Sequence, residues 1–126
     1  MAFQVTKKDL IKSQKCPPGM HIFELITVDE PYLKDNGVTV QKCEFESDTG
    51  HIVPVWFNSS VMDNMFEFVQ AADKITLNPE TMGEMEIELK DYLHKKVAGM
   101  VSHGPDKNGK IQHQIDNFYN ADKVPF

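Results

Sequence analysis

The sequence predicts a mainly β fold: a five-stranded barrel with one helix between strands 3 and 4 and a short N-terminal helix before the first strand. Three observations support this prediction. Runs of β-branched and aromatic residues recur along the chain, and turns containing glycine separate several of them. One segment rich in Met and Phe has helical spacing instead. The length of 126 residues fits a single domain, residues 1–126, with an N-terminal segment over residues 1–19 and a short tip over residues 120–126.

The N-terminal segment predicts a short helix. Thr6 is a suitable cap for a helix that ends by Gln14, and Leu10 and Ile11 give this helix an apolar anchor. The sequence Cys-Pro-Pro-Gly at positions 16–19 then ends it.

The first two strands are expected at Met20–Val28 and Val38–Ser47, on either side of an Asn-Gly turn that is typical of hairpins. The first strand is apolar on both faces, as central or strongly bent strands are. In the second strand, Val40 is out of phase with Cys43. We therefore expect a β-bulge near residues 41–42.

The third strand, residues 51–58, runs almost directly into the central helix. Alternation predicts that its inward face consists of Val53, Val55 and Phe57. Trp56 must then point to the opposite face. Ser60, followed three residues later by Asp63, resembles a capping box and predicts the start of the helix.

Over residues 80–91, methionine, isoleucine and leucine side chains are interspersed among five acidic residues, and this pattern fits either a second short helix or an edge strand. The fourth strand is expected at Leu93–Ser102 and the fifth at Ile111–Tyr119, joined by a turn over residues 105–109. Three strands, a helix and two strands are the element order of an OB-fold barrel. Other small barrels and α+β sandwiches share this order, so it does not define the fold by itself.

Composition limits the function classes. The net charge is −6 and the isoelectric point is near 5.3, which argues against a surface that binds polyanions everywhere. All thirteen basic residues are lysines, so the bidentate arginine contacts that read guanine edges in duplex DNA are absent from the sequence. Contact with a phosphate backbone in a sequence-tolerant way needs only point charges, and lysines supply these. No apolar run is long enough to span a membrane and the N-terminus does not resemble a signal peptide, so we expect cytoplasmic localisation.

Motifs for catalysis or metal binding are not apparent. The histidines are scattered without zinc-motif spacing: His21, His51, His94, His103 and His113. The acidic stretch lacks the glycine turn and the Asp-x-Asp spacing of a calcium loop. We expect no enzymatic activity, no metal and no cofactor, and a metal-dependent nuclease built on these acids is the weakest of the readings.

Three short stretches resemble phage-type single-stranded-DNA-binding proteins of the OB-fold family. Pro17–Ile22 resembles the Pro-Gly start of the first strand in that family, and Val55–Asn58 with Met65–Ala72 resembles its third strand and helix. Asn120–Phe126 is similar to the C-terminal tip that ends in Pro-Phe in bacterial and phage members. The resemblance implies a partner-binding tip, which docks replication and recombination proteins, formed here by Asp122, Val124, Pro125 and Phe126.

The resemblance also implies a set of nucleic-acid-binding residues. Trp56 is the first candidate, because an outward indole can stack on bases; the structural alternative is that it packs under the N-terminal segment or a second copy. Tyr32 is a second candidate for stacking, and the structural alternative is that it caps the barrel. The candidate phosphate contacts are Lys34, Lys42, Lys95, Lys96, Lys107 and Lys110. For the lysines, the ordinary alternative is a solvated surface role.

The sequence thus favours a sequence-tolerant protein that binds single-stranded DNA in phage replication or recombination, inside a bacterial host cell. The alternative is an acidic protein-interaction module, an accessory factor or inhibitor that binds a basic partner and no nucleic acid. Neither reading involves a membrane, and both leave open whether the chain forms a homo-oligomer.

Overall fold

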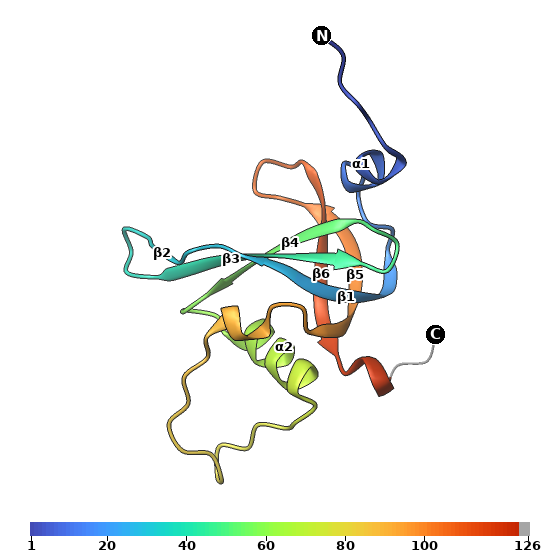
Figure 1. Cartoon of the computed structure of the whole chain (residues 1–126). Coiled ribbons are helices and arrows are strands. Elements are labelled where there is room, and N and C mark those ends of the chain that lie inside the picture. The colour runs from blue at the N-terminus through green and yellow to red at the C-terminus, as the bar shows by residue number, and fades with distance from the viewer. Residues whose placement is uncertain (124–126) are drawn as a thin grey trace.

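A computed structural model describes residues 1–123 and shows an antiparallel sheet of six strands with two α-helices (Figure 1). Along the chain, the elements are α1 (Lys7–Lys12), β1 (Gly19–Val28), β2 (Tyr32–Leu33), β3 (Thr39–Ser47), β4 (Ile52–Asn58), α2 (Asp63–Asp73), the 3-10 helix η1 (Leu89–Tyr92), β5 (Lys96–Pro105), β6 (Ile111–Tyr119) and the 3-10 helix η2 (Ala121–Lys123). The prediction of a mainly β fold with a helix between the third and fourth long strands is confirmed. None of the helices in the described part is both long and apolar enough to span a bilayer.

Hydrogen bonding places the long strands in the order β4–β3–β1–β5–β6, and β2 pairs with one end of β3. The sheet curves so that β4 and β6 approach each other, but over residues 1–123 no ladder joins these two edges. The sheet is therefore open and has six strands, where the sequence predicted a barrel of five. The extra strand, Tyr32–Leu33, has only two residues, which is too short for alternation to reveal it.

The core lies inside the curve of the sheet, on the side that α2 covers (Figure 1). Phe45, Phe68 and Phe118 pack there with ring centroids 5.3 to 5.4 Å apart. These rings come from β3, α2 and β6, so they hold the helix against both sides of the sheet. Aromatic contacts at this spacing add to the free energy gained by burying the rings.

Both helices form where the sequence predicts them, but only one start is as expected. At α1, Thr6 is the cap, and its hydroxyl accepts a hydrogen bond from the Asp9 amide at 3.2 Å. The predicted Ser60 cap of α2 is wrong, because Met62 holds the cap position and no side chain caps that end. The hydroxyl of Ser60 instead donates to the Asn58 side-chain oxygen at 2.8 Å, in a turn that ends β4.

The predicted bulge at residues 41–42 is also wrong. The β3–β4 register runs without interruption from Val40 to Glu46, and the only shift between β1 and β3 within the described residues leaves Ile26 unpaired in β1. Val40 is buried although it faces outward from the curve, because Tyr32 of β2 pairs with it on one side and Asn58 of β4 on the other. Val40 is thus out of phase with Cys43 because it is buried on the outer face of the sheet, and the strand itself has no bulge at this point.

Neither structure predicted for the acidic stretch forms. Residues 75–88 have no helix or strand and make an exposed loop below α2, and only Leu89–Tyr92 turns into a 3-10 helix (Figure 1). Single apolar residues alternating with glutamates gain little from a helix or a strand when neither face is buried. Ile87, near the end of this loop, and Leu89, just after it, pack against the core.

Candidate nucleic-acid interface

A groove of about 230 Å³ lies on the outer face of the sheet, between β4 and the hairpin that contains β2. Its walls and floor are Tyr32, Lys34, Asn36, Val38, Val40, Trp56, Asn58 and Ser60. We call this site the Trp56 groove. It brings together three of the residues that the sequence predicted, namely Trp56, Tyr32 and Lys34.

Trp56 faces outward because the strand alternates. Val55 and Phe57 on either side are buried in the core, whereas half of the Trp56 surface (50%) stays exposed. The prediction of an outward indole is confirmed, and the alternative in which the N-terminal segment covers it is not what the structure shows. The α1 helix lies instead at the β3–β4 turn, at the opposite end of β4, where Ile11 lines a pocket with Gly50.

Lys42 lies beside the indole. It pairs with Trp56 across the β3–β4 ladder, and its ammonium group is 5.7 Å from the centre of the indole ring. A cation at this distance is attracted to the ring face. The two side chains therefore place an aromatic surface and a positive charge next to each other on the outer face.

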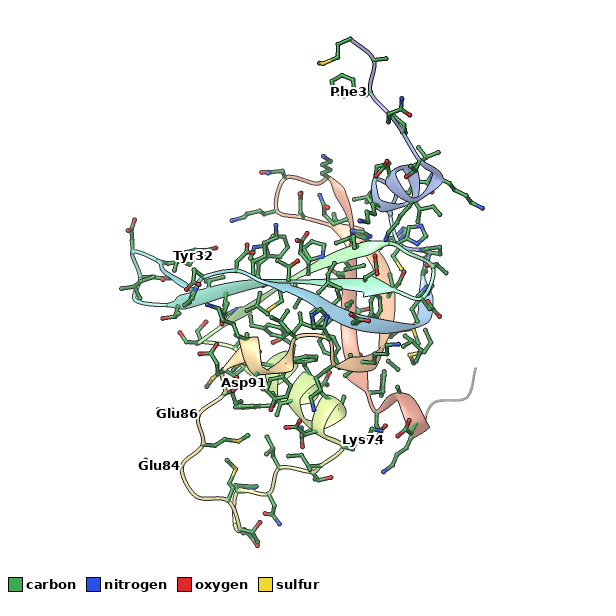
Figure 2. All side chains as sticks on the ribbon, viewed as in Figure 1. Phe3, Tyr32, Lys74, Glu84, Glu86 and Asp91 are labelled. Carbon is green, nitrogen blue, oxygen red and sulfur yellow. The ribbon has the colours of Figure 1, made fainter. Side chains whose placement is uncertain are left out.

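The β2–β3 hairpin holds the opposite wall of the groove. The turn closes through hydrogen bonds from the Gly37 amide to the Lys34 carbonyl at 3.0 Å and from the Lys34 amide to the Val38 carbonyl at 2.9 Å. Gly37 has a φ of +83°, which favours glycine at this position. Tyr32 lies at the base of the hairpin with 49% of its surface exposed (Figure 2). Backbone bonding thus fixes the positions from which Tyr32 and Lys34 extend.

Lys107 and Lys110 lie on the β5–β6 hairpin, outside the residues that line the groove. The Asp106 carboxylate organises this turn by accepting the amides of Lys110 at 2.9 Å and Asn108 at 2.8 Å. These backbone hydrogen bonds, that from Lys110 first, lower the pKa of Asp106 below its usual value. Both lysines are exposed and form no ion pair within the described chain. The β2–β3 and β5–β6 hairpins both project beyond the body of the sheet (Figure 1).

Lys95 and Lys96 lie apart from the groove. Lys95 is 3.8 Å from Asp73 at the end of α2. Lys96 pairs with Glu24 across β1 and β5, and it lines a pocket that also contains Glu46 and Asp48. Acidic neighbours offset both charges, so these lysines have less attraction left for a phosphate than those at the groove.

The predicted partner-binding tip is described only in part. Asp122 lies in η2 and forms an ion pair with Lys74 at the C-terminal end of α2. Both side chains are mostly exposed, which makes this pair a weak contribution to stability. Val124, Pro125 and Phe126 lie outside the described residues.

Sequence reasoning missed the polar floor of the groove. Asn58 lines it, and its side-chain oxygen also accepts the amide of Val61 at 2.8 Å. Asn36 lines the hairpin side, where its side-chain oxygen accepts the Val38 amide at 3.1 Å. Asn58 lies two residues after Trp56 in the same strand, so alternation could have placed it on the outer face as well. Val40, which is out of phase with Cys43, could have indicated the floor of the groove.

The histidines have structural partners. The His113 Nδ1 atom accepts the Cys16 amide at 2.8 Å, and His103 Nε2 lies 2.7 Å from the Cys16 carbonyl. His21 lies 2.8 Å from the Pro17 carbonyl and 3.1 Å from Asp48. These contacts anchor the link between α1 and β1. In residues 1–123, no three His, Cys, Asp or Glu side chains are grouped closely enough to hold a metal ion.

No protein-family model and no curated protein matches this chain. The geometry of the Trp56 groove is therefore the observation that points to a function. An exposed indole beside a cation, a second aromatic ring, a lysine at the rim and two amide side chains suit a flat aromatic ligand that carries negative charge.

Proposed function

We propose that this protein binds single-stranded DNA without marked sequence preference, in the Trp56 groove and along the β5–β6 hairpin. The observation that carries the proposal is the half-exposed indole of Trp56, with Lys42 beside it and Tyr32 and Lys34 across the groove. The reading of the sheet as a partly open barrel of the OB type is part of this proposal. In that fold, oligonucleotides lie on the face of the second and third strands, between two loops.

The energetics suit a sequence-tolerant ligand. Stacking of a base on an aromatic side chain contributes about 1–3 kcal/mol and varies little with the identity of the base. Lys34, Lys42, Lys107 and Lys110 offer four charges for the phosphates, and each neutralised phosphate adds about −0.7 to the salt slope of single-strand binding. Full use of the four predicts a slope of roughly −3.

The acidic total charge is compatible with this role because the charges are unevenly distributed. The residues that line the Trp56 groove include a lysine and no carboxylate, whereas the loop of residues 75–88 holds four glutamates and no lysine. Repulsion from acidic surfaces would leave the lysine-edged face as the favourable one for a polyanion. We place the protein in replication or recombination of a phage or phage-derived element, in the cytoplasm of a bacterial host, without enzymatic activity.

Fluorescence anisotropy of a labelled dT oligonucleotide tests the proposal. We expect an increase in anisotropy at low salt, loss of binding as salt rises, and much weaker binding of a duplex of equal length. Absence of any anisotropy change at low salt would contradict the proposal. That result would favour the second candidate, an acidic module that binds a basic protein, whose specific support is the exposed glutamate loop at residues 75–88.

A further inference from the structure

Two exposed segments of this chain are not used by the proposed function. The first is the N-terminal arm, residues 1–12, which extends away from the sheet (Figure 1). Its apolar side chains include Phe3, 83% exposed, and Val5, 73% exposed, and none of the residues of α1 is buried. The charged residues of the arm are Lys7, Lys8, Asp9 and Lys12. The arm is therefore both apolar and basic, and it leaves these side chains in solvent at a cost.

The second segment is the loop of residues 75–88, which we call the acidic methionine loop. It exposes Met82 and Met85, and its charged residues are Glu80, Glu84, Glu86 and Glu88. In the described chain, none of these glutamates forms an ion pair. Methionine side chains adapt to varied apolar partners because they are unbranched and polarisable.

The two segments lie at opposite ends of the molecule. In Figure 1 the arm leaves the top of the sheet, and the acidic methionine loop hangs below α2. Figure 2 shows the same separation between Phe3 and the pair Glu84 and Glu86. The arm packs at the β3–β4 turn through Ile11, at the end of the sheet away from α2. The arm of one chain therefore meets an acidic methionine loop only on another copy.

We propose that the N-terminal arm of one copy binds the acidic methionine loop of a second copy. Phe3 and Val5 pack against Met82 and Met85, and the lysines of α1 face the glutamates of the loop. Complementary charge steers such an encounter and sets its orientation, while the apolar contact supplies the attraction that remains at higher salt. The occupant is a second copy because one chain carries both complementary halves of the contact.

A contact between two different surfaces of the same protein leaves one arm and one loop free at the ends of every open assembly. Such contacts produce open rows unless the rotation closes a ring. Neither segment includes a residue of the Trp56 groove, so the groove stays accessible in each copy. The contact between arm and loop does not depend on what the groove binds.

Variants that reverse the charge of one segment or of the other test the contact between arm and loop. In sedimentation velocity at low salt, wild-type protein should show a sedimentation coefficient that rises with concentration. The variant Lys7→Glu/Lys8→Glu should associate at least about tenfold more weakly, and so should Glu84→Lys/Glu86→Lys, because each sets like charges against each other. An equimolar mixture of the two variants should associate again, since each then offers the opposite charge to the other.

The mixture is the decisive sample. Restored association supports the proposal, and a mixture that stays monomeric overturns it, as does wild-type protein that is monomeric at every concentration. All four positions are exposed, so folding should be unaffected, and circular dichroism checks this. The control Lys107→Glu/Lys110→Glu makes the same change of charge on the β5–β6 hairpin and should associate like wild type. Phe3→Ser should weaken association at 0.3 M salt more than at low salt, where charge contributes most.

Discussion

The Trp56 groove and the acidic methionine loop both expose large apolar side chains, but they do so in opposite ways. The groove lies on paired strands whose backbone hydrogen bonds and buried neighbours fix each side chain. The loop has no regular structure, and Met85 lies between two glutamates in the sequence. The difference shows that the net charge of −6 describes neither surface, because the groove lining has a lysine and no carboxylate, whereas the loop has four glutamates and no lysine.

The largest effect should be on the free energy of unfolding, because the strands that carry the groove pack on the core and Met85 of the loop is exposed. Phe45→Ala removes a fully buried ring that touches α2 and β6, and it should lower the free energy of unfolding by about 3–5 kcal/mol. Met85→Ala in the loop should change it by less than about 0.5 kcal/mol. Urea denaturation followed by circular dichroism measures both. Similar losses for the two variants would mean that the loop is part of the folded core.

Removal of the indole should affect binding without affecting the fold. Trp56→Ala should weaken binding of a dT oligonucleotide by about 1–3 kcal/mol, which is roughly a 5- to 150-fold rise in Kd, because stacking is lost. Phe3→Ala is a matched control, since it removes an exposed aromatic ring from the arm. On an oligonucleotide that holds one copy, this control should bind like wild type in anisotropy. An equal loss of oligonucleotide affinity in the two variants would contradict binding of DNA in the Trp56 groove.

The two sets of lysines should differ in salt dependence. Lys34→Ala at the groove should reduce the slope of log K against log salt by about 0.7, the contribution of one phosphate. Lys96→Ala, among Glu24, Glu46 and Asp48, should leave the slope unchanged. Anisotropy titrations at four salt concentrations give both slopes. A larger change at Lys96 than at Lys34 would place the strand at the pocket that Lys96 lines and not at the Trp56 groove.

A smaller effect should come from pH at the link between arm and sheet. Burial is the main cause that lowers the pKa of His113, followed by the nearby charges of His103, Lys15 and His51. Its Nδ1 atom accepts the Cys16 amide and must be unprotonated to do so. The unfolded chain therefore binds the proton more readily. This contribution to stability is complete above the unfolded pKa of about 6.5 and is lost as pH falls through the lower folded pKa.

Urea denaturation between pH 5 and pH 8 measures this loss. His113→Gln keeps an acceptor in the position and cannot titrate, so its stability should change less with pH than that of wild type. The loop and the groove contain no histidine, so neither should contribute to the difference.

Local pattern was enough to predict the long strands, the two α-helices and the outward direction of Trp56, because alternation and capping residues act within a few positions. The position of Lys96 could not be predicted in this way, because Glu24 becomes its neighbour only when β1 pairs with β5. The same limit explains the missed strand β2, which exists through its pairing with β3. The α2 start was mispredicted because Asn58 competes for the Ser60 hydroxyl. The neighbours of Lys96 and the strand β2 depend on which strands pair in space, and the spacing of residues along the sequence does not predict that pairing.

Tryptophan fluorescence tests the central claim most directly, because Trp56 is the only tryptophan in the chain. Titration with poly-dT oligonucleotide at low salt should quench the emission as bases stack on the indole, and added salt should restore it. Unchanged emission at saturating oligonucleotide and low salt would contradict the claim that the Trp56 groove receives single-stranded DNA.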